Sequence, residues 1–358
     1  MNATFVPEVL NIAVAGAGLI GRRHIELIQA SPRTRLSAIV DPTPASVTFA
    51  AELGVPHFDS LEALFAVQKP DGIFLATPNH LHVPGALLCA QHGVPAVIEK
   101  PVADTLEAGQ RLADVLARSS TPMLVGHHRR HSSTLRGARR AIQSGQLGRV
   151  VTVMGSAQFY KPDSYFEAGA WRKSLGGGPI LINLVHEMDN LRFLCGEIES
   201  VHAIASSAVR EFAVEDTAVM TLKFASGALG TFTLSDTVAS PRSWEQTSGE
   251  NLSYPRYPSE DCYFIAGTQG SLAVPTLRTW SYAQAGAEPG WWTPFVEATL
   301  TLDTVDPLAA QLDHFCDLVL GEAQPVITVA DALQTLRTVE AVRRSIATGQ
   351  TITVADLV

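Results

Sequence analysis

Several features that would place a protein in a broad class are missing from this sequence. Its 358 residues include only four cysteines, at 89, 195, 262 and 316, and no CxxC pair or other metal-ligand spacing joins them. This pattern argues against a disulfide scaffold and favours reduced thiols that fill space. Lys and Arg number 26 against 35 Asp and Glu, and the net charge of −9 argues against a general basic surface for nucleic acid.

The sequence also contains no apolar run long enough to span a bilayer. Its start, MNATFVPEVLNIAV, has neither the basic residues nor the apolar core and cleavage site of a secretory signal. We therefore expect a cytoplasmic protein without membrane or nucleic-acid partners, whose partner is a small molecule. A chain of 358 residues is long for one compact core, so two domains are expected.

The most informative segment is NIAVAGAGLIGRRHIELI, residues 11–28, where an apolar strand runs into three glycines and then a helical pattern. Gly16 permits a tight turn, Gly18 lets the backbone approach a pyrophosphate, and Gly21 allows the helix to pack close to the strand. The N-terminus of the helix offers free N–H groups to an anion. The segment therefore predicts a dinucleotide site, and the alternative is a glycine-rich turn of another α/β fold.

An acidic residue stands where such a site needs one. Asp41 lies twenty residues after Gly21, at the end of a second apolar strand over residues 36–40. A carboxylate there accepts hydrogen bonds from a ribose 2′-hydroxyl and repels a 2′-phosphate. Pro42 and Thr43 follow it, and no arginine that would attract the extra phosphate. We expect NAD as the cofactor in preference to NADP.

The first 125 residues alternate between strand and helix patterns, which predicts a doubly wound parallel sheet with helices on both faces. The expected strands lie near 11–15, 36–40, 71–75, 94–98 and 123–125. After Gly126 the pattern changes to one helix, about 132–144, and a series of strands with short turns. These strands, at 149–159, 200–209, 217–224, 228–235 and 262–266, predict an α+β domain with a large open, mainly antiparallel sheet.

These patterns divide the chain into three parts. We expect a cofactor-binding domain over 1–125, a substrate and oligomerisation domain over 126–305, and a C-terminal part over 306–358. The helices at 307–320 and 330–347 are expected to pack back near the first domain. Residues 236–261 are expected to form one long loop, and loops of that length are uncommon unless they serve a site.

The strand VPAVIEKP ends in Glu99, Lys100 and Pro101. In a doubly wound sheet the carboxyl ends of the strands face the ligand crevice, so Lys100 is expected to point toward cofactor and substrate. Its ammonium group would donate a hydrogen bond to a reacting oxygen and lower the pKa of a neighbouring base. The alternative is a solvated lysine at the end of a strand.

A second polar cluster lies in LGGGPILINLVHEMDNLRFLCG, residues 175–196. A helix over 182–194 would place Asn183, His186 and Asn190 on the side opposite an apolar stripe. The three glycines upstream let the backbone come close to a ligand. His186 is the candidate general base, because the pKa of histidine lies nearest working pH. Solvent exposure or a structural histidine is the alternative.

The segment GHHRRH, residues 126–131, leaves the last strand of the first domain. No carboxylate or cysteine ligand pattern completes a metal site there, so no metal is expected. Arg129 is the residue expected to grip substrate hydroxyls or a carboxylate, and an ordinary basic turn is the alternative. Tyr160, Trp171 and Arg172 would form another wall of the pocket, although aromatic side chains are more often found in cores.

With these motifs in place, the chain resembles the Gfo/Idh/MocA family, the glucose-fructose oxidoreductase and inositol dehydrogenase group. The resemblance covers the whole length, through GAGLIGRRH, ATPNHLHVPGALLCAQHGVPAVIEKP, VGHHRRH, WRKSLGGG and the helix of His186. It implies a Rossmann domain, an open-sheet domain, a nicotinamide-dependent reaction, a homodimer or homotetramer, and Lys100 and His186 beside the reacting carbon. The cofactor-binding positions that it implies are Gly16, Gly18, Leu19, Ile20, Gly21, Asp41, Thr77, Pro78, Asn79, His82, Glu99, Lys100 and Pro101.

One departure from the family pattern affects the site. Family members commonly carry an aspartate four residues before the histidine, and this chain has Ile182 there, with Asn183 beside it. The Asp and His pairing is therefore absent, and Asn183 is expected to contact the substrate instead.

The main hypothesis is reversible oxidation of a secondary alcohol of a sugar, cyclitol or related polyhydroxylated ring. A second hypothesis is a dehydrogenase of a carboxylated ring or cyclic dihydrodiol, in which Arg129 or Arg172 holds the carboxylate. A third hypothesis is a glycosidase that uses NAD in a transient redox cycle, and a fourth is a non-catalytic dinucleotide sensor.

Overall fold

A computed structural model describes residues 9–282 and 288–357. The chain divides into two compact units. Unit 1 comprises residues 1–128 and 308–336, and unit 2 comprises 129–307 and 337–358. Residues 308–336 of the C-terminal part belong to unit 1, and the residues from 337 onward belong to unit 2.

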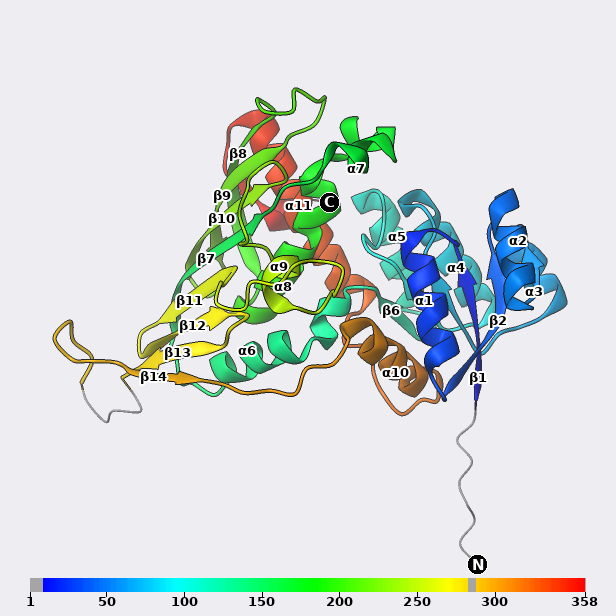
Figure 1. The fold of residues 1–358 in the computed structure, drawn as a ribbon, viewed down its shortest axis with the longest axis horizontal. Helices are drawn as coiled ribbons and strands as arrows, with labels where there is room; N and C mark the ends of the chain where they lie inside the picture. The colour runs from blue at the N-terminus through cyan, green and yellow to red at the C-terminus, as the bar shows by residue number, and fades with distance from the viewer. Residues whose placement is uncertain (1–8, 283–287, 358) are drawn as a thin grey trace, which may run out of the picture. The chain divides into compact units, whose positions relative to one another are not determined.

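Unit 1 contains a six-stranded parallel sheet with the strand order β3-β2-β1-β4-β5-β6. Figure 1 labels β1, β2 and β6 of this sheet. The order reverses between β1 and β4, which is where doubly wound sheets bind their ligands. Its elements are β1 (Leu10–Ala15), α1 (Leu19–Ala30), β2 (Thr34–Val40), α2 (Pro44–Leu53), β3 (His57–Phe58), α3 (Leu61–Val67), β4 (Gly72–Leu75), α4 (His82–His92), β5 (Ala96–Ile98), α5 (Leu106–Leu116), β6 (Met123–Val125) and α10 (Pro307–Val319).

Local sequence explains where these elements begin and end. The side chains of Ser60 and Thr105 accept hydrogen bonds from the helix N-termini of α3 and α5. Gly54 and Gly93 end α2 and α4 with left-handed φ angles of 67° and 62°. The central strands β1 and β4 are almost wholly buried, as parallel strands with both faces covered require. The predicted parallel sheet is confirmed, with β3 as an additional short strand.

Unit 2 contains a nine-stranded sheet in the order β14-β13-β12-β11-β7-β10-β9-β8-β15. Its elements are α6 (Ser133–Gln143), β7 (Val150–Gln158), α7 (Asp163–Glu167), α8 (Val185–Cys195), β8 (Ile198–Ser206), β9 (Thr217–Phe224), β10 (Leu229–Ser235), α9 (Trp244–Ser248), β11 (Tyr263–Gly267), β12 (Gly270–Val274), β13 (Arg278–Ser281), β14 (Val296–Thr299) and β15 (Ile352–Thr353). Helix α11 (Val329–Thr348) begins in unit 1 and ends in unit 2.

The sheet of unit 2 is mixed, because β7 and β10 are parallel neighbours while its other described pairs are antiparallel. Buried and exposed residues alternate along β9, so one face of the sheet is covered and the other is open. Helices α6 and α8 contact each other, and α6 contacts β12 (Figure 1). The open face carries exposed apolar side chains, including Met154, Ile204, Val219 and Leu229.

Two local expectations for unit 2 are corrected by the structure. Residues 236–261 are not one uninterrupted loop, because Ser243 caps the short helix α9 within them. The helix expected over 182–194 is present as α8 from Val185 onward, but its start lies in a π-helical turn, Ile180–Leu184. Asn190, expected on the polar side of that helix, is fully buried. Buried polar partners on α8 are invisible to a periodicity argument, which assumes that polar residues face water.

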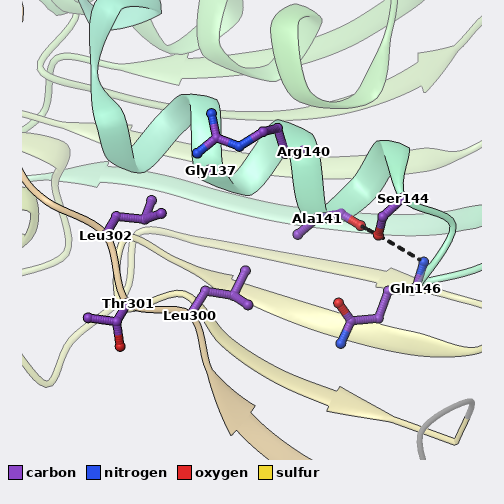
Figure 2. A pocket seen from close by; sticks show the side chains of 8 residues that line it. All are labelled: Gly137, Arg140, Ala141, Ser144, Gln146, Leu300, Thr301 and Leu302. Carbon is purple, nitrogen blue, oxygen red and sulfur yellow. Dashed lines mark hydrogen bonds between the residues drawn. The ribbon is translucent and has the colours of Figure 1, made fainter.

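Among residues 9–282 and 288–357, no helix is long and apolar enough to cross a membrane. A pocket of about 330 Å³ lies between the C-terminal half of α6 and residues 300–302 (Figure 2). It is lined by Gly137, Arg140, Ala141, Ser144, Gln146, Leu300, Thr301 and Leu302. None of these residues belongs to the sites expected from the sequence.

Candidate cofactor and substrate sites

The three glycines of the turn after β1 have different steric surroundings. Gly16 has a φ of 95°, and a Cβ added to it would lie 2.2 Å from the carbonyl oxygen of Ala76. A Cβ on Gly21 would lie 1.9 Å from the carbonyl oxygen of Gly16. Gly18, at the N-cap of α1, has no heavy atom within 4 Å of such a Cβ. The turn therefore needs Gly16 and Gly21 for its own packing and leaves open space in front of Gly18.

Asp41 is attached to this turn. Its Oδ2 accepts a hydrogen bond from the N–H of Ala17 at 2.8 Å, and its Oδ1 accepts from the N–H of Thr43 at 2.9 Å. Partial burial alone would raise the pKa of Asp41, but the hydrogen bonds from Ala17 and Thr43 hold it below its ordinary value. The carboxylate is therefore ionised and retains lone pairs for ribose hydroxyls.

The loop after β4 contributes the next polar groups. The hydroxyl of Thr77 is buried and has no hydrogen-bond partner among the described residues. Pro78 precedes a 3₁₀ turn that begins at Asn79. His82 is buried and bridges two loops, because its Nε2 lies 2.8 Å from the Thr77 carbonyl oxygen and its Nδ1 2.7 Å from that of Pro101. His82 thus ties the loop after β4 to the loop after β5.

These groups fit a dinucleotide. Four features lie just after the carboxyl ends of the parallel strands. They are the open space at Gly18, the start of α1 with exposed Leu19 and half-buried Ile20, the ionised Asp41, and the Thr77 hydroxyl, which has no partner among the described residues. Helix N-termini in this position bind phosphate through their free N–H groups. The residues present would hold the pyrophosphate at the glycine turn and the ribose hydroxyls at Asp41.

Glu99 is deeply buried and bonded within unit 1. Its Oε1 lies 2.8 Å from Nε2 of His24, and its Oε2 accepts from the N–H of Lys100 at 3.1 Å. Burial alone would raise the pKa of Glu99, but the hydrogen bond and charge of His24, with Lys100 and His128, lower it to about 2. Glu99 is thus a buried anion at the end of β5, directly before Lys100. The bond between Lys100 and Pro101 is cis.

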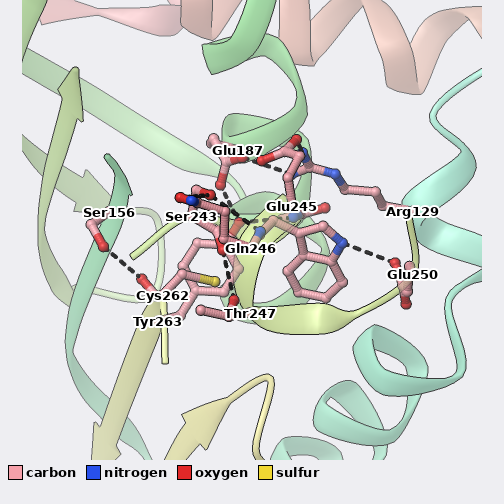
Figure 3. Close-up of polar contacts among 12 residues, drawn as sticks. Arg129, Ser156, Glu187, Ser243, Glu245, Gln246, Thr247, Glu250, Cys262 and Tyr263 are labelled. Atoms are coloured by element: carbon pink, nitrogen blue, oxygen red, sulfur yellow. Dashed lines mark hydrogen bonds and ion pairs between the residues drawn. The ribbon is translucent and has the colours of Figure 1, made fainter. Parts of the chain in front are cut away.

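The crossover segment after β6 leads into a buried network in unit 2 (Figure 3). Arg129 donates to Glu187 Oε1 at 2.7 Å and forms a second ion pair with Glu245. The hydroxyl of Tyr263 donates to Glu187. Burial would lower the pKa of Arg129, but Glu245 and Glu187 raise it above its ordinary value. Both terminal nitrogens of Arg129 are therefore committed to carboxylates, and it lies in the scaffold around α8.

The neighbouring residues of GHHRRH are also occupied or buried. Arg130 makes a bidentate pair with Asp189 of α8, at 2.9 and 2.7 Å, and His127 and His131 are buried. In the parts of the chain that the structure describes, no group of three or more His, Cys, Asp or Glu side chains is arranged to hold a metal ion. Arg129 and Arg130 together anchor the start of unit 2 to the middle of α8.

His186 lies in the first turn of α8, and Asn183 lies three residues before it in the π-helical turn. Both side chains are half-buried. The Oδ1 of Asn183 accepts a hydrogen bond from the Nζ of Lys161 at 2.8 Å. Sequence reasoning missed Lys161, which stands in FYKPDSYF after the end of β7. Its aromatic surroundings in the sequence are the signal that could have found it.

The remaining expected substrate residues lie on loops of unit 2. Tyr160 and Trp171 are each 58% exposed. The guanidinium of Arg172 lies 3.9 Å from the ring centre of Tyr165 and donates to that residue's carbonyl oxygen. The Nε of Arg172 is buried without a hydrogen-bond partner among the described residues. Arg172 therefore has a donor that no residue of 9–282 or 288–357 satisfies.

The glycine turn, Asp41 and the parallel sheet define unit 1 as a dinucleotide-binding Rossmann domain, and unit 2 adds an open mixed sheet. The chain belongs to the Gfo/Idh/MocA family. Residues 10–127 match the oxidoreductase family's NAD-binding Rossmann fold, and residues 135–273 match the GFO/IDH/MocA C-terminal domain. NAD is the cofactor of this domain.

Three named proteins illustrate what the chain is similar to. The rhizopine catabolism protein MocA of Rhizobium meliloti is 29% identical over 55% of this chain, and the match spans 60% of that protein, less than two thirds of its length. An inositol 2-dehydrogenase of Rhizobium meliloti (strain 1021) is 24% identical over 97% of this chain and 99% of its own. The WlbA dehydrogenase of Bordetella pertussis, solved with NADH and UDP-GlcNAcA, has a TM-score of 0.78 and 27% identity over 97% of this chain and 99% of that one.

Proposed function

We propose that this protein transfers a hydride between NAD and a secondary alcohol or ketone of a sugar, cyclitol or related polyhydroxylated ring. The proposal depends on one observation: a chain of this family has two side chains, Lys100 and His186, that can donate or accept a proton. Lys100 follows the strand β5 of the NAD-binding unit, and His186 opens α8 of the second unit. The inositol 2-dehydrogenase relative supports the substrate class.

The protein's own residues have separable tasks in this reaction. NAD, when bound, supplies the hydride acceptor at its nicotinamide ring. His186 takes the proton of the substrate hydroxyl, and Lys100 donates a hydrogen bond to the oxygen as negative charge develops on it. Glu99 is ionised and buried directly before Lys100, and the positive charge of Lys100 contributes to its lowered pKa.

The half-buried and exposed polar groups of unit 2 would bind the substrate. Asn183 precedes His186 by three residues, and Tyr160, Trp171 and Arg172 provide aromatic faces and a donor. Arg129 would act through the scaffold, since its ion pairs with Glu187 and Glu245 hold the helix that carries His186. This assigns the arginine a supporting task instead of direct contact with the substrate.

A carboxylated ring is the second candidate substrate, and one observation favours it. The buried Nε of Arg172 has no partner in residues 9–282 and 288–357, and arginine binds carboxylates through paired donors. The structure of the WlbA dehydrogenase was solved with UDP-GlcNAcA, which carries a carboxylate. Carboxylated and neutral rings tested side by side would separate the two substrate classes.

The test is NADH fluorescence after the protein is mixed with NAD and a panel of sugars, cyclitols, ring diols and uronic acids. We expect NADH to form with at least one member that carries a secondary ring alcohol. Release of free sugar from an aryl glycoside without net NADH would indicate an NAD-dependent glycosidase. Binding of NAD without turnover across the panel would contradict catalysis and favour a dinucleotide sensor.

We also propose that the protein is a homodimer or homotetramer that works in the cytoplasm. Apolar side chains such as Met154 and Ile204 on the open face of the sheet support self-association. The four cysteines are unpaired, as in a reducing compartment. Light scattering that returned only the 38.3 kDa monomer would contradict the oligomer.

A further inference from the structure

A buried lysine lies beside the helix of His186. Lys161 is 8% exposed, and its Nζ donates to Asn183 Oδ1 at 2.8 Å and lies 3.3 Å from Asp236 Oδ2. Lysine is rarely buried to this degree unless its charge is paired. Lys161 takes no part in the proposed hydride transfer, although its ammonium group lies next to Asn183.

Asp236 pairs with the ammonium group of Lys161 and also with a second cation, the guanidinium of Arg210. It is 2% exposed, and its Oδ1 accepts from Arg210 Nε at 3.0 Å while its Oδ2 faces Lys161. The ring centres of Phe159 and Tyr165 lie 5.5 and 5.0 Å from the Nζ, within the range of cation–π attraction. One carboxylate and two aromatic faces therefore confine Lys161 to a narrow position.

This position decides the orientation of the Asn183 amide. A side-chain amide presents one acceptor oxygen and one donor nitrogen, and the two are exchanged when the group flips. Because Lys161 has only donors when charged, it requires the oxygen of Asn183 to face it. The Nδ2 of Asn183 has no hydrogen-bond partner among the residues that the structure describes. It remains as a donor on a half-buried side chain three residues before His186.

We propose that Lys161 is a positioning residue that locks the Asn183 amide with its NH₂ group toward the substrate, so that the enzyme selects rings carrying an oxygen acceptor beside the reacting carbinol. This inference rests on the proposed function and names the substrate feature that Asn183 would recognise. A hydroxyl or oxo group on the adjacent carbon satisfies the donor. A ring that lacks this oxygen leaves the donor unpaired in the complex, which costs affinity.

The lock depends on the charge of Lys161. Burial lowers its pKa, and Arg210 acts in the same direction, while Asp236 and Glu245 oppose them. Tyr165 is the other titratable group that faces the Nζ. A neutral amine can accept as well as donate, so loss of the proton releases the amide from its fixed orientation. Alkaline pH should therefore loosen Asn183 before ordinary lysines titrate.

A direct test follows the Asn183 side-chain amide by NMR in the full chain labelled with ¹⁵N-asparagine, with Asn183→Asp identifying its signals. We expect these signals to shift at a pH below that at which an exposed lysine titrates, because burial lowers the pKa of Lys161. Lys161→Met should abolish that titration. Lys173→Met is the matched control, because Lys173 contacts Phe212 and not Asn183, and it should leave the titration intact. A pH-independent amide in the wild type, or a titration that persists in Lys161→Met, would overturn the proposal.

A kinetic test compares myo-inositol with its analogue that lacks the hydroxyl beside the reacting carbinol. Wild type should prefer myo-inositol by about 10-fold or more in kcat/KM, the value of one satisfied buried donor. Lys161→Met should lose most of that preference through KM, with NAD affinity unchanged. Equal losses on both rings would contradict selection by Asn183. If wild type oxidises neither ring while the amide still titrates as expected, inositol is not a substrate of this protein. The orientation of the Asn183 amide by Lys161 is then still supported.

Discussion

At the scale of single residues, the pKa of a buried carboxyl group in this chain depends on its immediate partners. Glu99 illustrates the point, because a carboxyl group buried at the end of β5 would by itself be neutral. His24, at 2.8 Å, keeps it charged beside Lys100. Glu187 differs, since burial raises its pKa despite the ion pair with Arg129. The same residue type therefore has a lowered pKa in one unit and a raised pKa in the other.

Glu99→Gln tests the first of these assignments. The pKa of Glu99 falls from 4.5 to about 2 on folding, so its stabilisation is present above pH 4.5 and is lost as the pH falls through about 2. The variant should lose about 3 kcal/mol of unfolding free energy at pH 6, at roughly 1.4 kcal/mol per pKa unit, and little at pH 2. Urea unfolding between pH 2 and 6 measures this difference.

The matched control for that series is Glu52→Gln, at an exposed position on α2. Its urea midpoints should follow the wild type within experimental error at every pH. If Glu99→Gln also tracked the wild type at pH 6, the carboxylate of Glu99 would not be the stabilising anion described above.

At the scale of elements, the turn after β1 uses different glycines for folding and for cofactor binding. Gly16→Ala would place a Cβ 2.2 Å from the Ala76 carbonyl oxygen at a φ of 95°, so it should destabilise unit 1 by about 3 kcal/mol or more. Gly18→Ala meets no atom within 4 Å and should fold normally. Its methyl group would occupy the space left for the pyrophosphate and should weaken NAD binding about 10-fold or more.

Thermal unfolding and NADH fluorescence titration of the two variants measure these opposite effects. Gly54→Ala, at the C-terminus of α2 with a φ of 67° and no atom within 4 Å, is the control for a left-handed glycine outside the site. It should lower stability by about 1 kcal/mol and leave NAD affinity unchanged. NAD affinity of wild-type strength in Gly18→Ala would contradict the assigned position of the pyrophosphate.

The elements also show which parts of the fold were predictable from the sequence. The parallel strands of unit 1, the cap at Thr105 and the turn around Gly16 follow from local patterns, because each is determined by residues close in the chain. The parallel pairing of β7 with β10 was not predicted, since strand order depends on contacts distant in sequence. The short strands β12 to β14 were missed because they are brief and carry weak alternation.

Some residues of the candidate site were likewise predictable from the sequence, and others were not. Gly18 lies at the N-cap of α1, and Asp41 and Lys100 follow the ends of β2 and β5, so local patterns locate all three in the chain. Arg129 was expected to face a substrate, and a linear pattern could not show that Glu187 and Glu245 would surround it. Lys161 was missed for the related reason that its partner Asn183 lies 22 residues away in the chain. Long-range ion pairs and hydrogen bonds are the part of a site that one sequence does not display.

At the scale of the whole molecule, the two units have complementary tasks in the proposed reaction. Unit 1 binds NAD and contributes Lys100, and unit 2 contributes His186 with the residues that support it. Neither unit contains both proton-handling groups, so turnover should require the intact chain. The family assignment rests on both units as well, because each matches a different domain of the same family.

The central claim is that Lys100 and His186 act on one substrate, and a double-mutant cycle tests it most directly. Lys100→Met, His186→Gln and the double variant are compared for NADH formation from the best panel substrate, with NAD affinity measured in parallel. Each single change should reduce kcat by about 10³-fold, and the double variant should be little worse than the poorer single one, as for groups that work together. NAD affinity should stay near the wild-type value. Wild-type turnover in either single variant, or losses that simply multiply in the double variant, would contradict the joint action of the two residues.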